Sequence, residues 1–193
     1  AKQTDKVDEL LLQARENEES VPTWPNVSPD NFLRGATRRY NHDHAHNVDA
    51  TNLSSFSQAV FDSRRKAWTN VDFLRRHIPG CEKAFISATA SILGVRETRR
   101  IRGEYVLTAE DVLNSRQFDD DIAHYHCYID IHPLVPGEPR GGICGQSPKP
   151  GTAYGIPYRC LLPQNIDNLL VAGRCASATH EAMASARMVP TCM

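Results

Sequence analysis

The spacing of apolar residues predicts two amphipathic helices in the first half of the chain. A short helix over residues 5–17 is indicated by four apolar residues at helical spacing, namely Val7, Leu10, Leu11 and Ala14. A long helix over residues 55–78 is indicated by a similar series, Val60, Phe61, Ala67, Trp68, Val71, Leu74 and Ile78. Pro79 and Gly80 follow this series directly and predict the end of the long helix.

Extended segments are predicted in the middle of the chain. Residues 84–106 are rich in β-branched and aromatic types with glycines as breaks, which predicts two strands. Thr108, with Asp111 three positions later, is typical of a capping box that begins a short helix. Residues 122–132 alternate in polarity and predict a half-buried strand. Its apolar face would hold Ala123, Tyr125, Cys127, Ile129 and Ile131, and its polar face His124, His126, Tyr128, Asp130 and His132.

The last third of the chain combines a predicted loop with one apolar run. Residues 133–157 contain six prolines and six glycines, a composition that predicts a long loop. Residues 169–172 are all apolar and predict a parallel strand, buried on both faces, that ends at Gly173. Pro190 suits the first turn of a helix.

Charge and composition restrict the kind of partner. The chain has 22 Lys and Arg residues against 23 Asp and Glu residues, and its formal net charge is -1. No overall positive field therefore favours nucleic acid or an anionic membrane surface. No apolar run approaches the roughly 20 residues that a membrane span needs. We therefore expect neither nucleic acid nor a membrane as a partner.

The cysteines give no sign of a metal centre or a redox pair. All six are scattered along the chain, and no two of them form a C-x-x-C pair. We therefore expect mostly free thiols with a structural role.

A group of alternating histidines is the first candidate for chemistry. His42, His44 and His46 would lie on one face of an extended segment, and that spacing could bind zinc, copper or iron. One of these histidines, or the neighbouring Asn47, could instead line a substrate pocket. Loop carbonyls could also satisfy all three imidazoles without any ligand. The pattern alone leaves the three interpretations open.

Arginines near residue 100 are the second candidate. On a strand, Arg96, Arg100 and Arg102 share one face, whereas Arg99 lies on the other. We therefore expect Arg99 to point inward, toward a carboxylate such as Asp130, a carboxylate of the substrate or a phosphate of a cofactor.

Two further patterns fit ligand contacts. Tyr158 and Arg159 follow the long predicted loop, and either present a phenol and a guanidinium to a substrate or simply finish a strand. Gly173 and Arg174 follow the predicted buried strand, at the kind of strand end where anionic cofactors bind. A plain turn between a strand and a helix would have the same pattern.

Three motifs resemble the C-terminal half of the FAD-dependent oxidoreductase family, in the order that the family has them. They are the segment from Val95 to Ile101 (VRETRRI) with Gly103 and Tyr105, the segment Ile156-Pro157-Tyr158-Arg159, and the segment from Asn168 to Arg174 (NLLVAGR) followed by Ser177, His180, Ala184, Ser185 and Arg187. The similarity extends from about residue 40 to residue 193.

This resemblance implies a flavoprotein of two parts, one that holds FAD and one that covers the flavin and forms the substrate pocket. The second part is expected to have an α+β fold, with an antiparallel or mixed sheet and flanking helices. On this view residues 1–30 are an N-terminal helix and connector, residues 31–160 are the substrate domain, and residues 161–193 hold the last strand of an FAD-binding domain. The chain has no G-x-G-x-x-G fingerprint for the pyrophosphate. We therefore expect a fragment that the missing FAD-binding part completes, or that self-associates.

The resemblance also implies roles for individual residues. The expected FAD ligands are Gly173, Arg174, Ser177, Pro190 and Thr191. The expected substrate contacts are Arg99, Tyr158, Arg159 and Asn47, and the catalytic base would be His44, His46 or His180. No metal is expected.

The leading hypothesis is part of a flavin-dependent oxidoreductase that transfers a hydride between a small polar substrate and FAD. The 193 residues alone would be inactive. The alternative is a non-enzymatic binding module without cofactor, which would bind carbohydrate, or a metal through His42, His44 and His46. Loss of FAD on Arg174→Ala, or loss of a metal on His44→Ala, would separate the two hypotheses.

Overall fold

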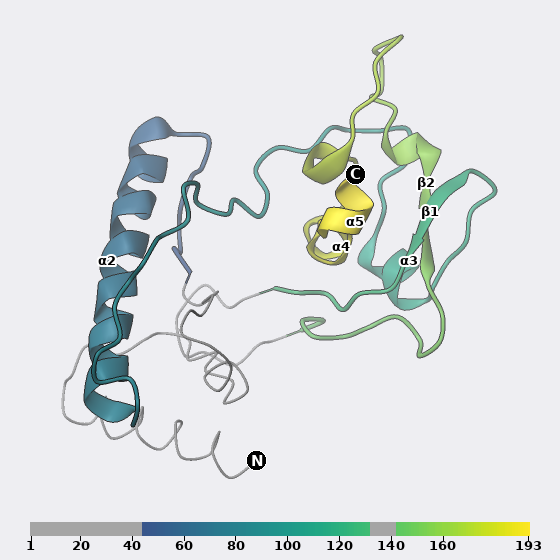
Figure 1. Ribbon diagram of the computed structural model, residues 1–193. Helices are drawn as coiled ribbons and strands as arrows, with labels where there is room; N and C mark the ends of the chain where they lie inside the picture. The colour runs from purple at the N-terminus through teal and green to yellow at the C-terminus, as the bar shows by residue number, and fades with distance from the viewer. Residues whose placement is uncertain (1–43, 132–141) are drawn as a thin grey trace. The chain divides into compact units, whose positions relative to one another are not determined.

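The chain forms two compact units, which are described separately. The computed structural model describes residues 44–131 and 142–193 (Figure 1). Unit 1 contains the described residues up to Leu93, and unit 2 contains those from Gly94 onward. The helix predicted over residues 5–17 lies outside the described residues. The domain boundaries predicted after residues 30 and 160 remain predictions.

Unit 1 is built on one long helix, α2 (Leu53–His77). The side chain of Asn52 caps its start by accepting a hydrogen bond from the backbone N–H of Ser55 at 3.1 Å. Basic residues fill the last turn, where the helix dipole favours positive charge. The prediction of a long helix over residues 55–78 is therefore confirmed, with a start two residues earlier than predicted.

Only part of the apolar series of α2 is buried. The buried side chains on the helix are Ala59, Asn70, Phe73 and Leu74. In contrast, the large side chains of Phe61 and Trp68 are exposed. The sequence pattern placed both aromatics in the same series as Leu74, because helical spacing alone does not show how wide the covered face is.

No helix among the described residues is both long and apolar enough to cross a membrane.

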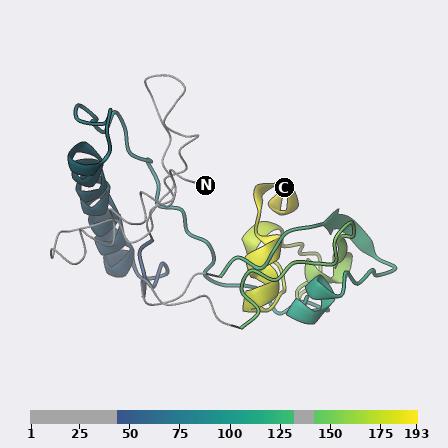
Figure 2. The ribbon, with the colours of Figure 1, turned by 90° about the horizontal axis from the view of Figure 1, so that it is seen from below.

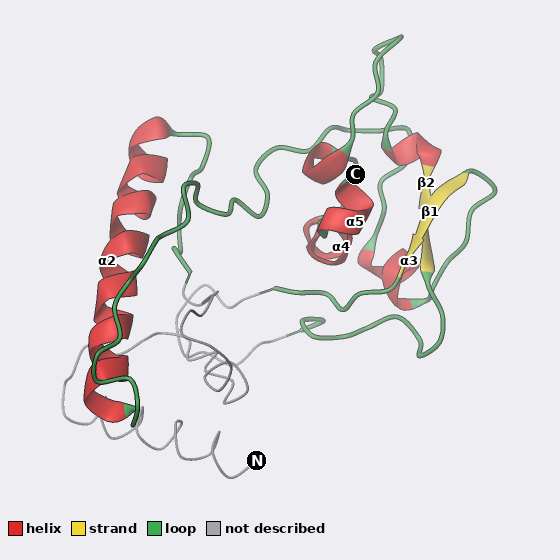
Figure 3. Ribbon diagram, viewed as in Figure 1, coloured by secondary structure: helices red, strands yellow, loops and turns green. Residues whose placement is uncertain are grey.

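Unit 2 combines short helices with a small antiparallel sheet, as Figure 3 shows. Strand β1 (Asp121–Tyr125) pairs with strand β2 (Tyr154–Pro157), with Tyr125 opposite Tyr154. The helical elements are α3 (Ala109–Leu113), α4 (His180–Ala186), α5 (Val189–Cys192) and the 3-10 turns η2 (Tyr158–Cys160) and η3 (Gly173–Cys175). This mixture of helix and antiparallel sheet confirms the α+β class.

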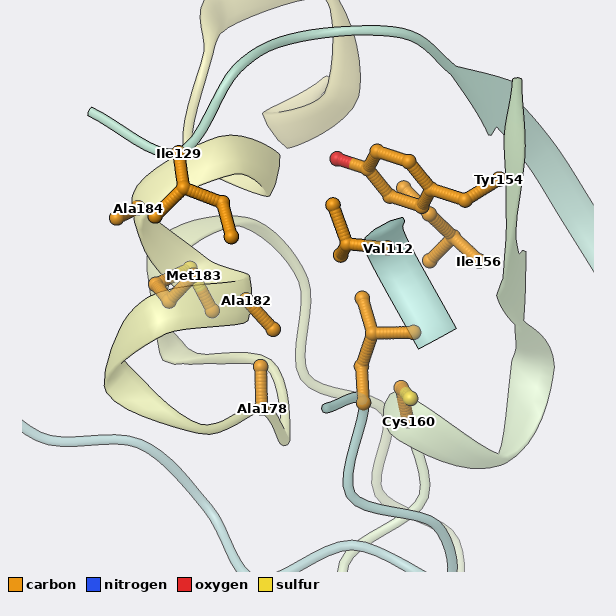
Figure 4. Packing of buried hydrophobic residues seen from close by; sticks show 10 residues of the cluster. Val112, Ile129, Tyr154, Ile156, Cys160, Ala178, Ala182, Met183 and Ala184 are labelled. Carbon is orange, nitrogen blue, oxygen red and sulfur yellow. The ribbon is translucent and has the colours of Figure 1, made fainter. Parts of the chain in front are cut away.

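The core of unit 2 lies between β2, α3 and α4. Tyr154 and Ile156 project from β2 toward Val112 of α3, and Ala182 and Met183 of α4 complete the cluster (Figure 4). All five are buried. Burial of such side chains stabilises a fold by about 1.5 to 3 kcal/mol each, so this cluster holds the short elements of unit 2 together.

Helix α3 begins with the predicted capping box. Thr108 Oγ1 accepts a hydrogen bond from the Asp111 N–H at 3.2 Å, and Asp111 Oδ2 accepts one from the Thr108 N–H at 2.9 Å. Burial of the Asp111 carboxyl acts to raise its pKa, but the hydrogen bonds from Thr108, Tyr105 and Arg116 outweigh this effect and lower it. The capping box is therefore confirmed and carries an ionised carboxylate.

The prediction of two strands over residues 84–106 is wrong. The described structure has no strand in this range, apart from an isolated bridge at Gly103. The backbone N–H of Ile101, for example, donates to the carbonyl of Cys175 in a turn rather than to a neighbouring strand. The β-branched residues favour an extended backbone, but a strand also needs a partner with a regular ladder of hydrogen bonds.

The prediction of a buried strand over residues 169–172 is also wrong. Leu169 and Leu170 are 44% and 55% exposed, and the Val171 N–H donates to the carbonyl of Leu161 at 2.9 Å. Among the described residues no strand pairs with this run. The run therefore belongs to a loop that projects from the rest of unit 2, drawn in yellow-green in Figure 1.

The strand predicted over residues 122–132 is confirmed only in its first part, as β1. Exposure alternates along the chain up to Tyr128, but Ile129 and Asp130 are both buried. Alternation stops there because Asp130 forms ion pairs inside unit 2. The predicted loop over residues 133–157 is shorter than expected, since β2 occupies its last residues.

Gly103 lies in a space that admits no side chain. A Cβ atom at this position would come within 2.7 Å of Ser177 Cβ and 3.1 Å of the carbonyl oxygens of Arg159 and Leu162. We expect Gly103→Ala to lower the free energy of unfolding by about 1 to 3 kcal/mol, the usual effect of overpacking. The change is measured by urea unfolding. The matched control is Gly94→Ala, where nothing lies within 4 Å of the added atom, and an equal loss in both variants would contradict this account.

Candidate functional site

Glu97 connects the arginine-rich segment to the start of α4. Its Oε1 atom accepts a hydrogen bond from Arg100 Nη1 at 2.7 Å and another from His180 Nδ1 at 2.7 Å. His180 is the first residue of α4, which the side chain of Thr179 caps. Sequence reasoning named His180 but missed Glu97, although an acidic residue among four arginines is a signal for ion pairing.

Asp130 is a second carboxylate, and it forms ion pairs with two arginines. Its Oδ2 atom lies 2.8 Å from Arg96 Nη1 and 3.8 Å from Arg187 Nη2, and its backbone carbonyl accepts a hydrogen bond from Arg187 Nη2 at 2.6 Å. The side chain of Arg187 is only 8% exposed. Burial lowers the pKa of Arg187, and the nearby positive charges of Arg96 and Arg174 lower it further. Arg187 therefore lies close enough to two other guanidinium groups to be repelled by both.

The prediction that Arg99 points inward is wrong. Arg99 is exposed, and Arg96 is the arginine that pairs with Asp130. The prediction assumed strand geometry, in which alternate residues face opposite sides, and this segment has no strand. The expected carboxylate partner is the right one, but it pairs with Arg96. A substrate contact through Arg99 remains a prediction.

Gly173 and Arg174 lie in η3, which contacts α5. Figure 2 shows the two C-terminal helices, α4 and α5, in yellow. Gly173 has φ 77°, in the region that favours glycine, and a Cβ atom there would lie 3.5 Å from the Cys192 carbonyl of α5. Arg174 is exposed, and no carboxylate of the described residues forms an ion pair with it. Its guanidinium is therefore available to an anion.

The other three residues expected to bind FAD differ in exposure. Pro190 is exposed in the first turn of α5, as predicted. Thr191 uses its hydroxyl within the chain, since Oγ1 donates to the Met188 carbonyl at 2.9 Å. Ser177 is 1% exposed, and its hydroxyl has no hydrogen-bond partner among the described residues. The structure therefore does not bring the Ser177 hydroxyl to the exposed surface where Arg174 lies.

Tyr158 and Arg159 have different surroundings. Arg159 pairs with Asp120 through Nε at 2.9 Å and Nη2 at 3.0 Å, and this bidentate contact holds the pKa of Asp120 below its ordinary value. Tyr158 lines an open cavity of about 660 Å³, together with Glu104 and residues 162, 163 and 165–170. Of the two, Tyr158 is the one that lines this cavity.

The histidines near residue 45 lie in unit 1, not with the other candidates. The rings of His44 and His46 have centroids 6.2 Å apart, and the His44 carbonyl accepts a hydrogen bond from Lys66 Nζ at 2.9 Å. Asn47 is exposed, with φ 55°. His42 lies outside the described residues. Within the described parts of the chain, no three His, Cys, Asp or Glu residues are grouped as metal ligands.

The cysteines are free thiols, as the sequence predicts. Burial raises the pKa of Cys160 to about 11, whereas Cys175 is exposed. Because the thiolate is the reactive form, we expect iodoacetamide to modify Cys175 in the native protein and Cys160 only after unfolding. Mass spectrometry of timed digests measures both rates. Equal rates for the two cysteines before unfolding would show that Cys160 is not buried.

The α+β fold and an unpaired guanidinium beside a glycine turn fit a protein that handles an anionic cofactor. The sequence model of a family described as FAD dependent oxidoreductase matches residues 2–193. The chain therefore belongs to the FAD-dependent oxidoreductase family, which confirms the resemblance seen in the three motifs. Comparisons with curated proteins and with solved structures found no match.

Proposed function

We propose that this chain forms the substrate side of a flavoenzyme that transfers a hydride between a small polar substrate and FAD. The observation that carries the proposal is the exposed Arg174, which follows the left-handed turn at Gly173 and has no carboxylate partner among the described residues. A guanidinium in this position suits an anionic group. Membership in the family makes FAD the expected anion. Bound FAD would supply the two-electron chemistry.

The proposed FAD contacts are arranged around η3 and α5. Arg174 would bind the ribityl or phosphate oxygens, and the backbone at Gly173 would allow a close approach. Pro190 and Thr191 would place the first turn of α5 beside the flavin, where the positive end of the helix dipole favours negative charge. Ser177 would contribute by fixing the backbone, because its N–H donates to the Cys160 carbonyl and its carbonyl accepts from the Leu107 N–H.

The proposed substrate is small and polar. Tyr158 supports this proposal because its phenol lines the 660 Å³ cavity with Glu104. Arg99 is exposed and would bind a negative group of the substrate, whereas Arg159 would act through Asp120, with which it pairs. A substrate contact through Asn47, an exposed residue, stays a prediction. His44, His46 or His180 would accept the proton that leaves the substrate.

The loop at residues 162–170 supports a proposal about completion of the fold. Ile166, Leu169 and Leu170 all expose large apolar side chains on it. We assign this surface to the FAD-binding part of the full-length protein, which would supply the pyrophosphate cradle. Without that part, the same surface would drive self-association, and the chain would be inactive.

The proposal predicts a specific loss of cofactor affinity. In the full-length polypeptide, we expect Arg174→Ala to raise the dissociation constant of FAD about tenfold or more, because a hydrogen bond to a charged group contributes about 1.5 to 3 kcal/mol. Quenching of flavin fluorescence measures the constant. The control is Arg65→Ala, an exposed arginine on α2. Unchanged FAD affinity in the Arg174 variant would refute this placement of the cofactor.

A further inference from the structure

Glu97 and His180 form a hydrogen-bonded pair in which the carboxylate is the acceptor. Glu97 Oε1 accepts hydrogen bonds from both Arg100 Nη1 and His180 Nδ1, each at 2.7 Å. An arginine is always charged, so the carboxylate that it binds is ionised and can only accept. The hydrogen in the second contact must therefore lie on Nδ1 of His180.

This assignment leaves a free lone pair on the other edge of the ring. In a neutral imidazole with its hydrogen on Nδ1, the Nε2 atom is the acceptor. The side chain of His180 is 51% exposed, and Nε2 has no hydrogen-bond partner among the described residues. A base with these properties is oriented on one side and open to a small molecule on the other.

We propose that Glu97 is the positioning residue of a proton-transfer pair in which Nε2 of His180 accepts a proton from the substrate. The inference rests on the proposed function. The O–H or N–H bond of the substrate breaks, its proton forms a bond to Nε2, and the hydride from the adjacent carbon goes to FAD. The imidazolium then has both nitrogens protonated, with Nδ1–H held by Glu97, and its exposed edge returns the proton to solvent.

The pairing selects His180 from the three histidines that the sequence offers as bases. Glu97 belongs to the arginine-rich motif and His180 to the closing motif, and the two positions are 83 residues apart in the sequence. Arg100 holds the carboxylate in place by its own contact with Oε1. Glu97 therefore has two contacts, an ion pair with Arg100 and a hydrogen bond with His180, and only the second can orient the imidazole.

The test is the tautomer of His180, read from the ¹⁵N chemical shifts of its ring at a pH where the ring is neutral. We expect the hydrogen on Nδ1 in the wild-type chain and in Glu97→Gln, whose amide oxygen still accepts. We expect Glu97→Leu to lose this tautomer. Glu181→Gln, which changes the neighbouring carboxylate on α4, should keep it. A wild-type hydrogen on Nε2, or an unchanged tautomer in Glu97→Leu, would overturn the proposal.

A second measurement does not depend on the leucine variant folding. Diethylpyrocarbonate reacts with an unprotonated ring nitrogen. At a pH where the ring is neutral, we expect Glu97→Gln to slow the reaction at His180, because an amide oxygen polarises the Nδ1–H less than a carboxylate does and leaves Nε2 less nucleophilic. The other histidines should keep their rates. A purely structural glutamate would leave the rate at His180 unchanged, which would also overturn the proposal. Both measurements need no FAD, so their failure is distinguishable from a failure of the flavin to bind.

Discussion

Replacing Asp130 with alanine is expected to lower the free energy of unfolding by about 3 kcal/mol, at the lower end of the 3 to 5 kcal/mol for a broken buried ion pair. The carboxylate is the ion-pair partner of both Arg96 and Arg187, and the Arg187 side chain is only 8% exposed. Alanine would leave two guanidinium groups close together, one of them buried. The backbone contact of Arg187 with the residue 130 carbonyl survives the change, which is why the lower value is expected. Urea unfolding at 25 °C measures the loss.

The control for this prediction is Asp119→Ala. Asp119 is exposed and precedes β1, so its replacement should change the free energy of unfolding by less than about 0.5 kcal/mol. A double variant, Asp130→Ala with Arg187→Leu, should recover part of the loss because it removes the uncompensated charge. If the double variant were less stable than Asp130→Ala by the full effect of Arg187→Leu, the ion pair would not be the cause.

Replacing Tyr154 with alanine is expected to lower the free energy of unfolding by about 3 to 5 kcal/mol. The Tyr154 ring is fully buried in the core of unit 2. Its hydroxyl lies 3.0 Å from Ser185 Oγ, which donates to the Cys127 carbonyl at 2.8 Å. Alanine would therefore leave a large cavity and remove one partner from a buried hydrogen-bond chain. Thermal unfolding and urea unfolding should both show the loss.

The variant Tyr154→Phe separates the ring from the hydroxyl. Phenylalanine keeps the packing, and Ser185 still donates to the Cys127 carbonyl, so we expect a loss of only about 0.5 to 1.5 kcal/mol. Equal losses in the alanine and phenylalanine variants would show that the hydrogen bond, rather than the packing of the ring, stabilises this part of the core.

The sequence predicted the elements that depend on local interactions. The long helix α2 and the capping box of Thr108 and Asp111 were predictable because helical spacing and caps involve residues a few positions apart. The strands over 84–106 and 169–172 were wrong because strand pairing depends on distant segments that a local pattern does not show. For the same reason the prediction for Arg99 failed once its strand was absent.

The candidate site was predictable in part. The closing motif led to Gly173, Arg174 and Pro190, and the structure places them in two adjacent elements, η3 and α5. Glu97 was missed, because its contact with His180 joins residues 83 positions apart. Only the folded chain brings this carboxylate to the first residue of α4.

The measurement that tests the central claim most directly is a visible absorption spectrum, paired with an intact mass, on the purified full-length polypeptide after incubation with FAD and gel filtration. We expect flavin absorption in the fractions that contain the protein, and we expect the bound flavin to be released as FAD on denaturation. We also expect Arg174→Ala to elute with less flavin than Arg65→Ala. A full-length polypeptide that elutes without flavin absorption would contradict the assignment of FAD to this protein.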